Sequence, residues 1–296
     1  MVVSGWLETP RTVSLRRSRA SVSQAETLWT VASREEAVLL SPFTAMVVPF
    51  PEPGRRLACL IDEWEGRSRV RVVERLSMDD PWSLVTQDRS TGVTTTVVVT
   101  ETRSGSRIHM EMSCEAPRAV ARARLNSFEA QVAPWLEQVT RVAEGFAELP
   151  EPRVEAVRAA GRLGPDTASI RGRRAVPAKR HEIWQVLTST AAQPPETYRF
   201  WTRTGPVVVG HWLCSITEAA GMQAVVREVV ECIEGERLTF DTVAGGHHRA
   251  LSGWALEDGV GGTVVSLTHE CATSHVGLPP LVDLALDRLL GLLGDR

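Results

Sequence analysis

The sequence has few residues of the kinds that build a disulfide-bonded, zinc-binding or membrane-spanning protein. Its five cysteines, spread over 296 residues, form no CxxC pair, which argues against a disulfide framework and a zinc site. No run of about 18 apolar residues occurs, so no transmembrane helix is expected. Residues 1–12 lack the pattern of a secretory signal peptide. We therefore expect a cytoplasmic protein with reduced thiols.

The net charge and the absence of known catalytic motifs argue against further classes of protein. A net charge of -3 gives no electrostatic reason to expect nucleic acid or an anionic membrane as a partner. The sequence contains no GxSxG, HExxH, P-loop or dinucleotide-binding motif, and no cofactor is expected. The sequence contains nine tryptophans but a single tyrosine, Tyr198, so large apolar rings are plentiful and phenolic hydroxyls are scarce. Any catalysis would depend on the shape of a cavity and on one or two polar groups.

An internal repeat organises the chain. The tripeptide Val72-Val73-Glu74 recurs as Val229-Val230-Glu231, 157 residues later. Further anchors recur in the same order: Trp29 and Trp184, Cys59 and Cys214, and Gly66 and Gly221 at a spacing of 155, then Gly105 and Gly262, and Cys114 and Cys271 at 157. This repetition predicts two copies of one fold. We place them at residues 1–147 and 168–296, with a proline-containing linker and a short helix at 148–167.

Each copy shows the same order of predicted elements. An alternating strand comes first, at residues 12–22 and 168–176, and a helix follows. Ser23 and Glu26 have the spacing of a capping box at the start of the first helix. Several strands separated by Gly or Asp turns come next. A long apolar helix closes each copy, at residues 125–146 and 279–293.

This order of elements, twice, resembles the helix-grip fold of the START/Bet v1-like (SRPBCC) superfamily. Two tandem copies in about 300 residues look like the di-domain polyketide aromatase/cyclases. The resemblance implies an α+β protein of two tandem helix-grip domains. Each domain would have an antiparallel curved sheet wrapped around a long C-terminal helix, with an apolar cavity between them. We therefore expect the first helix, which carries Trp29 or Trp184, to close one end of each cavity.

Strand alternation predicts which side chains face the cavities. In the strand at 107–114, Met110 and Met112 share the inward face with Ile108 and Cys114, and a shift of 157 residues places His269 in an inward position. His109 is predicted to face solvent. The side chains of Val70 and Val72 are also predicted to face inward. A shift of 157 residues from Val70 then gives an inward Arg227 in the second copy.

Arg227 and His269 are the candidate catalytic residues. An inward arginine needs a partner, which could be Glu231, Asp241 or a ligand oxygen. His269 is either a proton carrier in the cavity or an imidazole held in the core by a neighbour. His247 and His248 fit an exposed turn better than a metal site, and no metal is expected.

The candidate ligand-binding residues are large and apolar, and for several of them plain core packing is the alternative. They are Trp29, Trp64, Met110, Met112, Phe128, Trp135, Trp184, Trp201 and Trp212.

The first copy's inward face is predicted to be almost purely apolar, which favours a ligand poor in oxygen, such as a polyene. The leading hypothesis is a protein of secondary metabolism that binds or cyclises an extended polyketide or polyene intermediate. The alternatives are a non-catalytic sequestration protein that protects its producer, and an interaction module of the kind found in chaperone activators. The expected partner is a hydrophobic small molecule, and a carrier protein or polyketide synthase is a further candidate.

Overall fold

The computed structural model describes residues 11–49, 57–64, 67–79, 82–160, 163, 166–191, 198–217, 223–244, 248–272 and 279–294. Contacts between residues divide the chain into two compact units. The first, here domain 1, contains Met1–Trp64 and Arg71–Val157. The second, domain 2, contains Glu65–Val70 and Arg158–Arg296. The predicted limits at 147 and 168 stay predictions.

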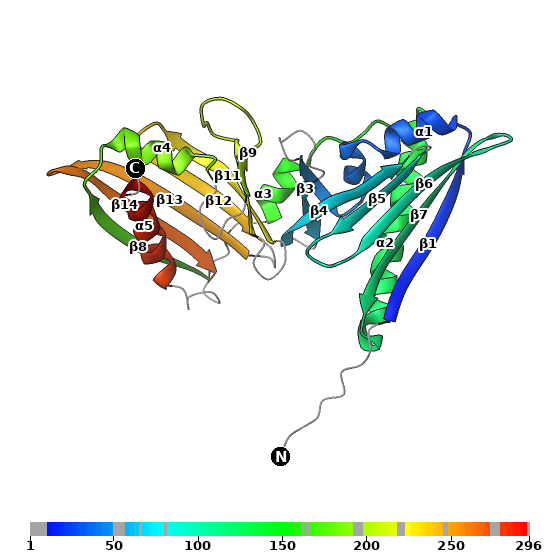
Figure 1. Ribbon diagram of the computed structural model, residues 1–296, viewed down its shortest axis with the longest axis horizontal. Coiled ribbons are helices and arrows are strands. Elements are labelled where there is room, and N and C mark those ends of the chain that lie inside the picture. The colour runs from blue at the N-terminus through cyan, green and yellow to red at the C-terminus, as the bar shows by residue number, and fades with distance from the viewer. Residues whose placement is uncertain are drawn as a thin grey trace, which may run out of the picture. The chain divides into compact units, whose positions relative to one another are not determined.

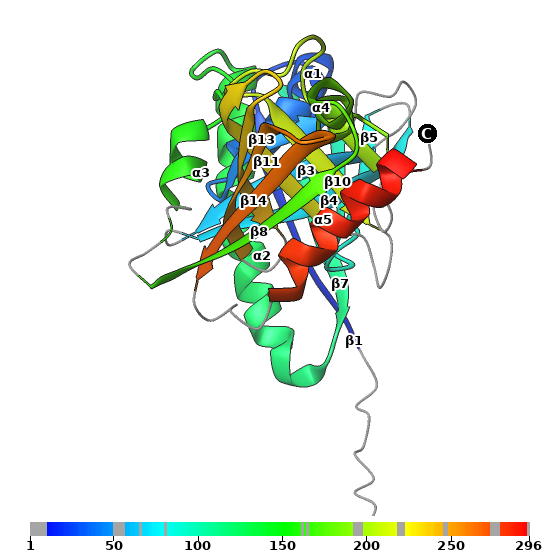
Figure 2. The ribbon, with the colours of Figure 1, turned by 90° about the vertical axis from the view of Figure 1, so that its left-hand side faces the viewer.

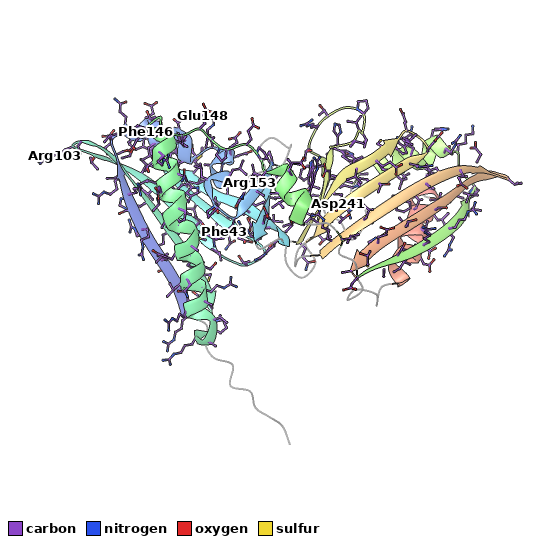
Figure 3. The ribbon with its side chains drawn as sticks, turned by 180° about the vertical axis from the view of Figure 1, so that it is seen from behind. Phe43, Arg103, Phe146, Glu148, Arg153 and Asp241 are labelled. Atoms are coloured by element: carbon purple, nitrogen blue, oxygen red, sulfur yellow. The ribbon has the colours of Figure 1, made fainter. Side chains whose placement is uncertain are left out.

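Domain 1 is built on an antiparallel sheet of seven strands, in the order β1-β7-β6-β5-β4-β3-β2 (Figure 1). The strands are β1 (Arg11–Ser21), β2 (Thr44–Pro49), β3 (Leu57–Trp64), β4 (Arg67–Asp79), β5 (Ser83–Asp88), β6 (Thr94–Thr102) and β7 (Gly105–Ala116). Between β1 and β2 lie the helix α1 (Ala25–Ala32) and the 3-10 helix η1 (Glu35–Leu40). The long helix α2 (Arg118–Ala143) follows β7 and packs along β1 and β7 (Figure 3).

The core of domain 1 lies between α2 and the inward face of the sheet. Strand β7 alternates between buried and more exposed residues, and Ile108, Met110, Met112 and Cys114 are all buried. The buried face of α2 supplies Phe128 to the same core. The predicted alternation of β7 is therefore confirmed.

Domain 2 repeats this plan, with strand order β8-β14-β13-β12-β11-β10-β9. The strands are β8 (Thr167–Val176), β9 (Tyr198–Trp201), β10 (Trp212–Thr217), β11 (Gln223–Ile233), β12 (Arg237–Ala244), β13 (His248–Gly259) and β14 (Gly262–Ala272). The helix α4 (Arg180–Thr188) follows β8, and α5 (Pro279–Gly294) packs on β8 and β14 (Figure 2). The short helix α3 (Val154–Ala160) precedes this domain's sheet.

Two of the glycine anchors have a steric explanation. Gly105 begins β7 with φ of 141°, and a side chain there would collide with the backbone oxygen of Ser21. Gly262 begins β14, and a side chain there would collide with the backbone oxygen of Val176. In each domain the hairpin end passes so close to the first strand that only glycine fits.

Gly172 marks a close approach that domain 1 does not share. A Cβ atom at this position of β8 would lie 2.6 Å from Cγ1 of Val282 and 2.7 Å from Cδ1 of Leu286, both on α5. Gly172 pairs with Leu267 as Arg17 pairs with Met110 in domain 1. Helix α5 therefore packs directly on the backbone of β8.

The predicted capping box at the first helix is wrong. Helix α1 begins at Ala25 after the N-cap Gln24, which makes no side-chain capping bond. The Ser23 hydroxyl donates instead to the backbone oxygen of Ala143, 2.8 Å away at the end of α2. The Ser23 side chain, which the local pattern assigned to the helix start, thus makes a tertiary contact instead.

The prediction of two tandem helix-grip domains is confirmed. Each domain has seven antiparallel strands, a short helix after the first strand and a long helix after the last. No helix in the described part of the chain is long and apolar enough to cross a membrane.

Candidate functional sites

Domain 2 contains a cavity of about 310 Å³ between its sheet and α5. Most of the wall is apolar, and Leu213, Phe240, Trp254 and Leu289 are among the residues that form it. The polar groups in the wall are Arg199, Arg227, Ser252, His269 and Arg288. The wall of the cavity is therefore mostly apolar, and its charged side chains are basic.

Arg227 and His269 lie in this same cavity, on different strands. Arg227 on β11 lies beside Leu213 of β10, and its Nη1 donates to the hydroxyl oxygen of Ser215 at 2.7 Å. His269 on β14 pairs across the sheet with Ser252, and the Ser252 hydroxyl lies 2.9 Å from its Nδ1. That contact fixes the orientation of the imidazole ring. The wall of one cavity thus contains both of the polar residues that the sequence assigned to the inward face.

The carboxylates offered as partners of Arg227 are engaged elsewhere. Glu231 accepts from Thr239 at 2.9 Å and from Arg237. Asp241 binds Arg249, with an Nη2–Oδ2 distance of 2.6 Å. Burial raises the pKa of Asp241 above its ordinary value, although its bonds to Arg249 oppose that rise.

Arg199 and Trp254 are cavity residues that the sequence reasoning missed. Arg199 lies on β9, and its Nη2 donates to the backbone oxygen of Leu187 at 3.0 Å. Strand β9 has only four residues, too few for alternation to show a face. Trp254 lies opposite Leu267 on β14, so the alternation of β14 extended to its neighbour β13 would have found it.

Domain 1 contains a cavity of about 380 Å³ between its sheet, η1 and α2. Its apolar wall includes Leu60, Leu84, Val97, Met110, Met112 and Trp135. Trp135 donates from Nε1 to the backbone oxygen of Ala37 at 2.8 Å, which fixes the ring against η1. Met110, Met112 and Trp135 are thus the ligand candidates that this cavity contains.

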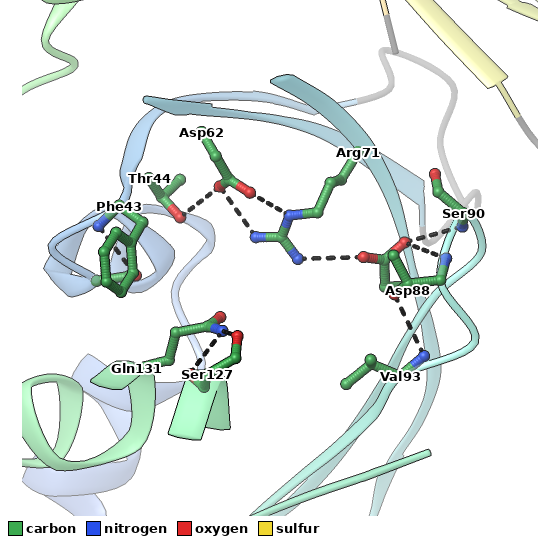
Figure 4. A network of polar contacts seen from close by, with 11 residues as sticks. Phe43, Thr44, Asp62, Arg71, Asp88, Ser90, Val93, Ser127 and Gln131 are labelled. Carbon is green, nitrogen blue, oxygen red and sulfur yellow. Dashed lines mark hydrogen bonds and ion pairs between the residues drawn. The ribbon is translucent and has the colours of Figure 1, made fainter. Parts of the chain in front are cut away.

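A buried ion-pair network forms one side of this cavity (Figure 4). Arg71 on β4 donates two hydrogen bonds to Asp62 on β3, one from Nε and one from Nη2 at 3.0 Å. Its Nη1 donates to Asp88 at 3.4 Å. Thr44 donates to Asp62 at 3.1 Å, and the Asp88 carboxylate accepts the backbone N–H of Ser90 at 2.8 Å. Burial works to lower the pKa of Arg71, but attraction to the two carboxylates outweighs it and raises that pKa.

The prediction that Val70 and Val72 face the first cavity is wrong. Arg71, Val73 and Arg75 line it, and the two valines are buried on the opposite face of β4. The inward face of domain 1 is therefore not purely apolar.

Each of the two equivalent strands contains a β-bulge. Strand β4 has its bulge at Leu76 and β11 has its bulge at Val230, 154 residues later. Aligning the bulges matches Arg227 with Val73. The repeated tripeptide is displaced by three residues from this structural equivalence, so the spacing of 157 residues that relates Val70 to Arg227 does not join equivalent positions of β4 and β11.

Trp212, a candidate ligand-binding residue, does not line the second cavity. The neighbouring Leu213 lines the cavity, and Trp212 is buried on the opposite face of β10. The equivalent strand β3 behaves in the same way, since Leu60 lines the first cavity while Cys59 and Ile61 are buried on the other face.

The remaining tryptophan and phenylalanine candidates lie outside the two cavity linings. Phe128 is buried in the core of domain 1, against which Trp29 packs. Trp184 packs against the core of domain 2. Trp201 does so too, donates to the backbone oxygen of Thr188 at 2.9 Å, and stacks on Phe240 with ring centroids 6.3 Å apart. Trp201 therefore packs against Phe240, which lines the second cavity.

Three candidates cannot be placed. His247 lies outside the described residues, as do the side chains of His248 and Trp64. Within the described ranges, no group of three or more His, Cys, Asp or Glu side chains is arranged to hold a metal ion.

Comparison with known proteins finds similarity among solved structures. No family model matches the sequence, and no curated protein matches it. The di-domain ARO/CYC BexL from the BE-7585A biosynthetic pathway is 11% identical over 96% of this chain and 95% of its own, with a TM-score of 0.38. The di-domain ARO/CYC StfQ from the steffimycin pathway is 12% identical over 90% and 87%, with a TM-score of 0.35. Ara h 8.0201 is 11% identical over 44% of this chain and 99% of its own, with a TM-score of 0.36.

Proposed function

We propose that this protein binds an extended polyketide intermediate and promotes its ring closure in the cavity of domain 2. The observation that carries the proposal is that Arg227 and His269 line one cavity, with the His269 ring oriented by Ser252. A guanidinium and an oriented imidazole are the donor and the proton carrier that an aldol-type cyclisation needs.

The reaction requires neither an oxidant nor a reductant. Arg227 donates hydrogen bonds to a ketone oxygen, which makes the carbonyl carbon more electrophilic. His269 takes a proton from a methylene group flanked by two carbonyls, and the resulting carbanion forms a carbon–carbon bond to the polarised carbonyl. The new alkoxide recovers the proton from the imidazolium. The product is a cyclic hydroxyketone, and loss of water from it gives the unsaturated ring.

The cavities also favour a ligand that carries oxygen atoms. Their volumes, about 310 and 380 Å³, lie at the lower end of the range for small-molecule sites. Arg227 lies in the wall of one cavity and Arg71 in the wall of the other, among apolar side chains. A pure polyene offers no oxygen atom with which these arginines could form a hydrogen bond. A polyketide can supply a carbonyl oxygen to each.

The test is ring closure of a synthetic poly-β-ketone thioester, measured by chromatography above the spontaneous rate. His269→Gln is expected to lower the protein-dependent rate by about 100-fold or more, and Arg227→Met by a similar factor. His109→Gln is the control, because His109 lies on the outward face of β7. A protein-dependent rate that both cavity substitutions leave unchanged contradicts the proposal.

The two alternatives give different results in the same experiment. A sequestration protein binds the thioester but does not change its rate of cyclisation, and His269→Ala leaves binding intact. An interaction module binds no such compound. A carrier protein as partner and a cytoplasmic location are part of the same proposal.

A further inference from the structure

We infer that the cavity of domain 1 is a second ligand site, selective for uncharged carbonyl compounds over anions. The inference deepens the proposed function by giving the two cavities different ligand classes. It rests on that proposal only in treating each cavity as a binding site.

The first argument is the neutralised charge of Arg71. Its side chain is held between Asp62 and Asp88, and all three side chains are largely buried, with exposed fractions of 17%, 18% and 6%. Two carboxylates so close to the guanidinium more than cancel its charge. An anion that entered here would gain little from Arg71 and would be repelled by Asp62 and Asp88.

The second argument is that Arg71 keeps donors for a neutral oxygen. Its bonds to the two carboxylates use three of its five N–H groups, and one hydrogen is left on each terminal nitrogen. Figure 4 shows Gln131 of α2 across the space from the guanidinium. Gln131 donates its amide nitrogen to Ser127, at 3.0 and 3.1 Å, which leaves its carbonyl oxygen as an acceptor toward the cavity. The polar side of this cavity therefore suits a neutral carbonyl group, with or without a neighbouring hydroxyl.

The third argument is the contrast with domain 2. Around the first cavity, three arginines are balanced by three carboxylates: Arg34, Arg71 and Arg75, and Glu35, Asp62 and Asp88. The described wall of the second cavity carries Arg199, Arg227 and Arg288 and no carboxylate. The charges around the first cavity thus balance, which suits an uncharged ligand.

The apolar wall indicates the shape of the ligand. Met110 and Met112 lie side by side on the inward face of β7, and the Trp135 ring belongs to the same wall. Thioethers and indole rings make favourable contacts with flat unsaturated rings. The expected ligand of domain 1 is therefore a flat, uncharged ketone.

Three naphthalene probes with the same number of non-hydrogen atoms can test this selectivity by titration calorimetry. They are acetylnaphthalene, the naphthoate anion and isopropenylnaphthalene, each substituted at the same ring position. They present a neutral carbonyl, a carboxylate and no oxygen. Met110→Trp fills the first cavity, and Leu267→Trp fills the second at the matching position of β14. Titration of the Leu267→Trp protein therefore reports on domain 1.

In the Leu267→Trp protein, acetylnaphthalene is expected to bind at least about ten-fold more tightly than naphthoate. Adding Arg71→Met is expected to weaken acetylnaphthalene by about ten-fold and to leave isopropenylnaphthalene unchanged, which also shows that the cavity is still folded. Adding Asp62→Asn keeps the side-chain shape and removes one negative charge, so naphthoate is expected to bind more tightly. A gain of binding cannot come from misfolding.

Three results would overturn the inference: naphthoate binding as tightly as acetylnaphthalene in the Leu267→Trp protein, acetylnaphthalene binding that Met110→Trp does not affect, or no gain of naphthoate binding with Asp62→Asn. None of these results depends on ring closure in domain 2. A protein that fails the cyclisation assay and shows the selectivity refutes the proposed function alone, and the reverse outcome refutes the inference alone.

Discussion

Replacing Gly172 by alanine is expected to destabilise domain 2, because α5 crosses β8 at this residue with no room for a side chain. The new Cβ would lie 2.6 Å from Val282 and 2.7 Å from Leu286, about 1 Å inside normal carbon–carbon contact. Overpacking of this kind costs about 1–3 kcal/mol. Since Val282 also lines the second cavity, the shift of α5 is expected to weaken ligand binding there as well.

The cost can be measured by urea unfolding, with hydrogen exchange used to assign it to a domain. A loss of about 2 kcal/mol corresponds to a fall in Tm of about 8 °C for a domain of this size. The second substitution Val282→Ala removes one clashing methyl group, so the double-mutant cycle of Gly172→Ala and Val282→Ala is expected to show a coupling of about 1 kcal/mol. A change in unfolding free energy below about 0.5 kcal/mol, with no coupling, would refute the close approach.

Two further predictions concern domain 1. Burial lowers the pKa of His109, and the positive charges of Arg16 and Arg107 lower it further. As the pH falls, the unfolded chain therefore takes up a proton at this residue before the folded protein does. The stability of domain 1 is then expected to fall as the pH drops through the range just below neutrality. His109→Gln is expected to reduce this loss in urea unfolding at pH 7 and about pH 5, and an unchanged pH dependence would contradict it. Gly105→Ala is expected to destabilise domain 1 by about 2 kcal/mol or more, because alanine meets both an unfavourable φ and the Ser21 oxygen. Thermal unfolding checks this, and a normal Tm would contradict it.

The architecture could be predicted because it depends on signals that repeat. Gly105 and Gly262 recur because each hairpin end passes against the first strand of its sheet, and no other residue fits there. The alternation of β7 and β14 also identified Met110, Met112 and His269 as cavity residues, since each of these strands runs without a bulge beside its neighbours.

The polar side of the first cavity could not be predicted, for a definite reason. Alternation separates the two faces of β4, but it does not show which face points inward when apolar residues are buried on the other face as well, as Val70 and Val72 are. The prediction took the valines as the inward face and therefore placed Arg71 on the outward face, the reverse of what the structure shows. Its partners Asp62 and Asp88 come from two other strands, and their meeting depends on a pairing register that one sequence does not reveal.

The pairing of Arg158 with Glu228 determines where the chain can be divided to express the second domain by itself. Glu228 is 2% exposed, and Arg158 donates to both of its oxygens, at 2.9 and 3.0 Å from Nε. A fragment that began at residue 168 would lack Arg158 and would leave a carboxylate buried without its charge partner, at a cost of about 3 kcal/mol or more. A fragment intended to fold alone should therefore begin ahead of α3, even though that helix precedes the first strand of the domain.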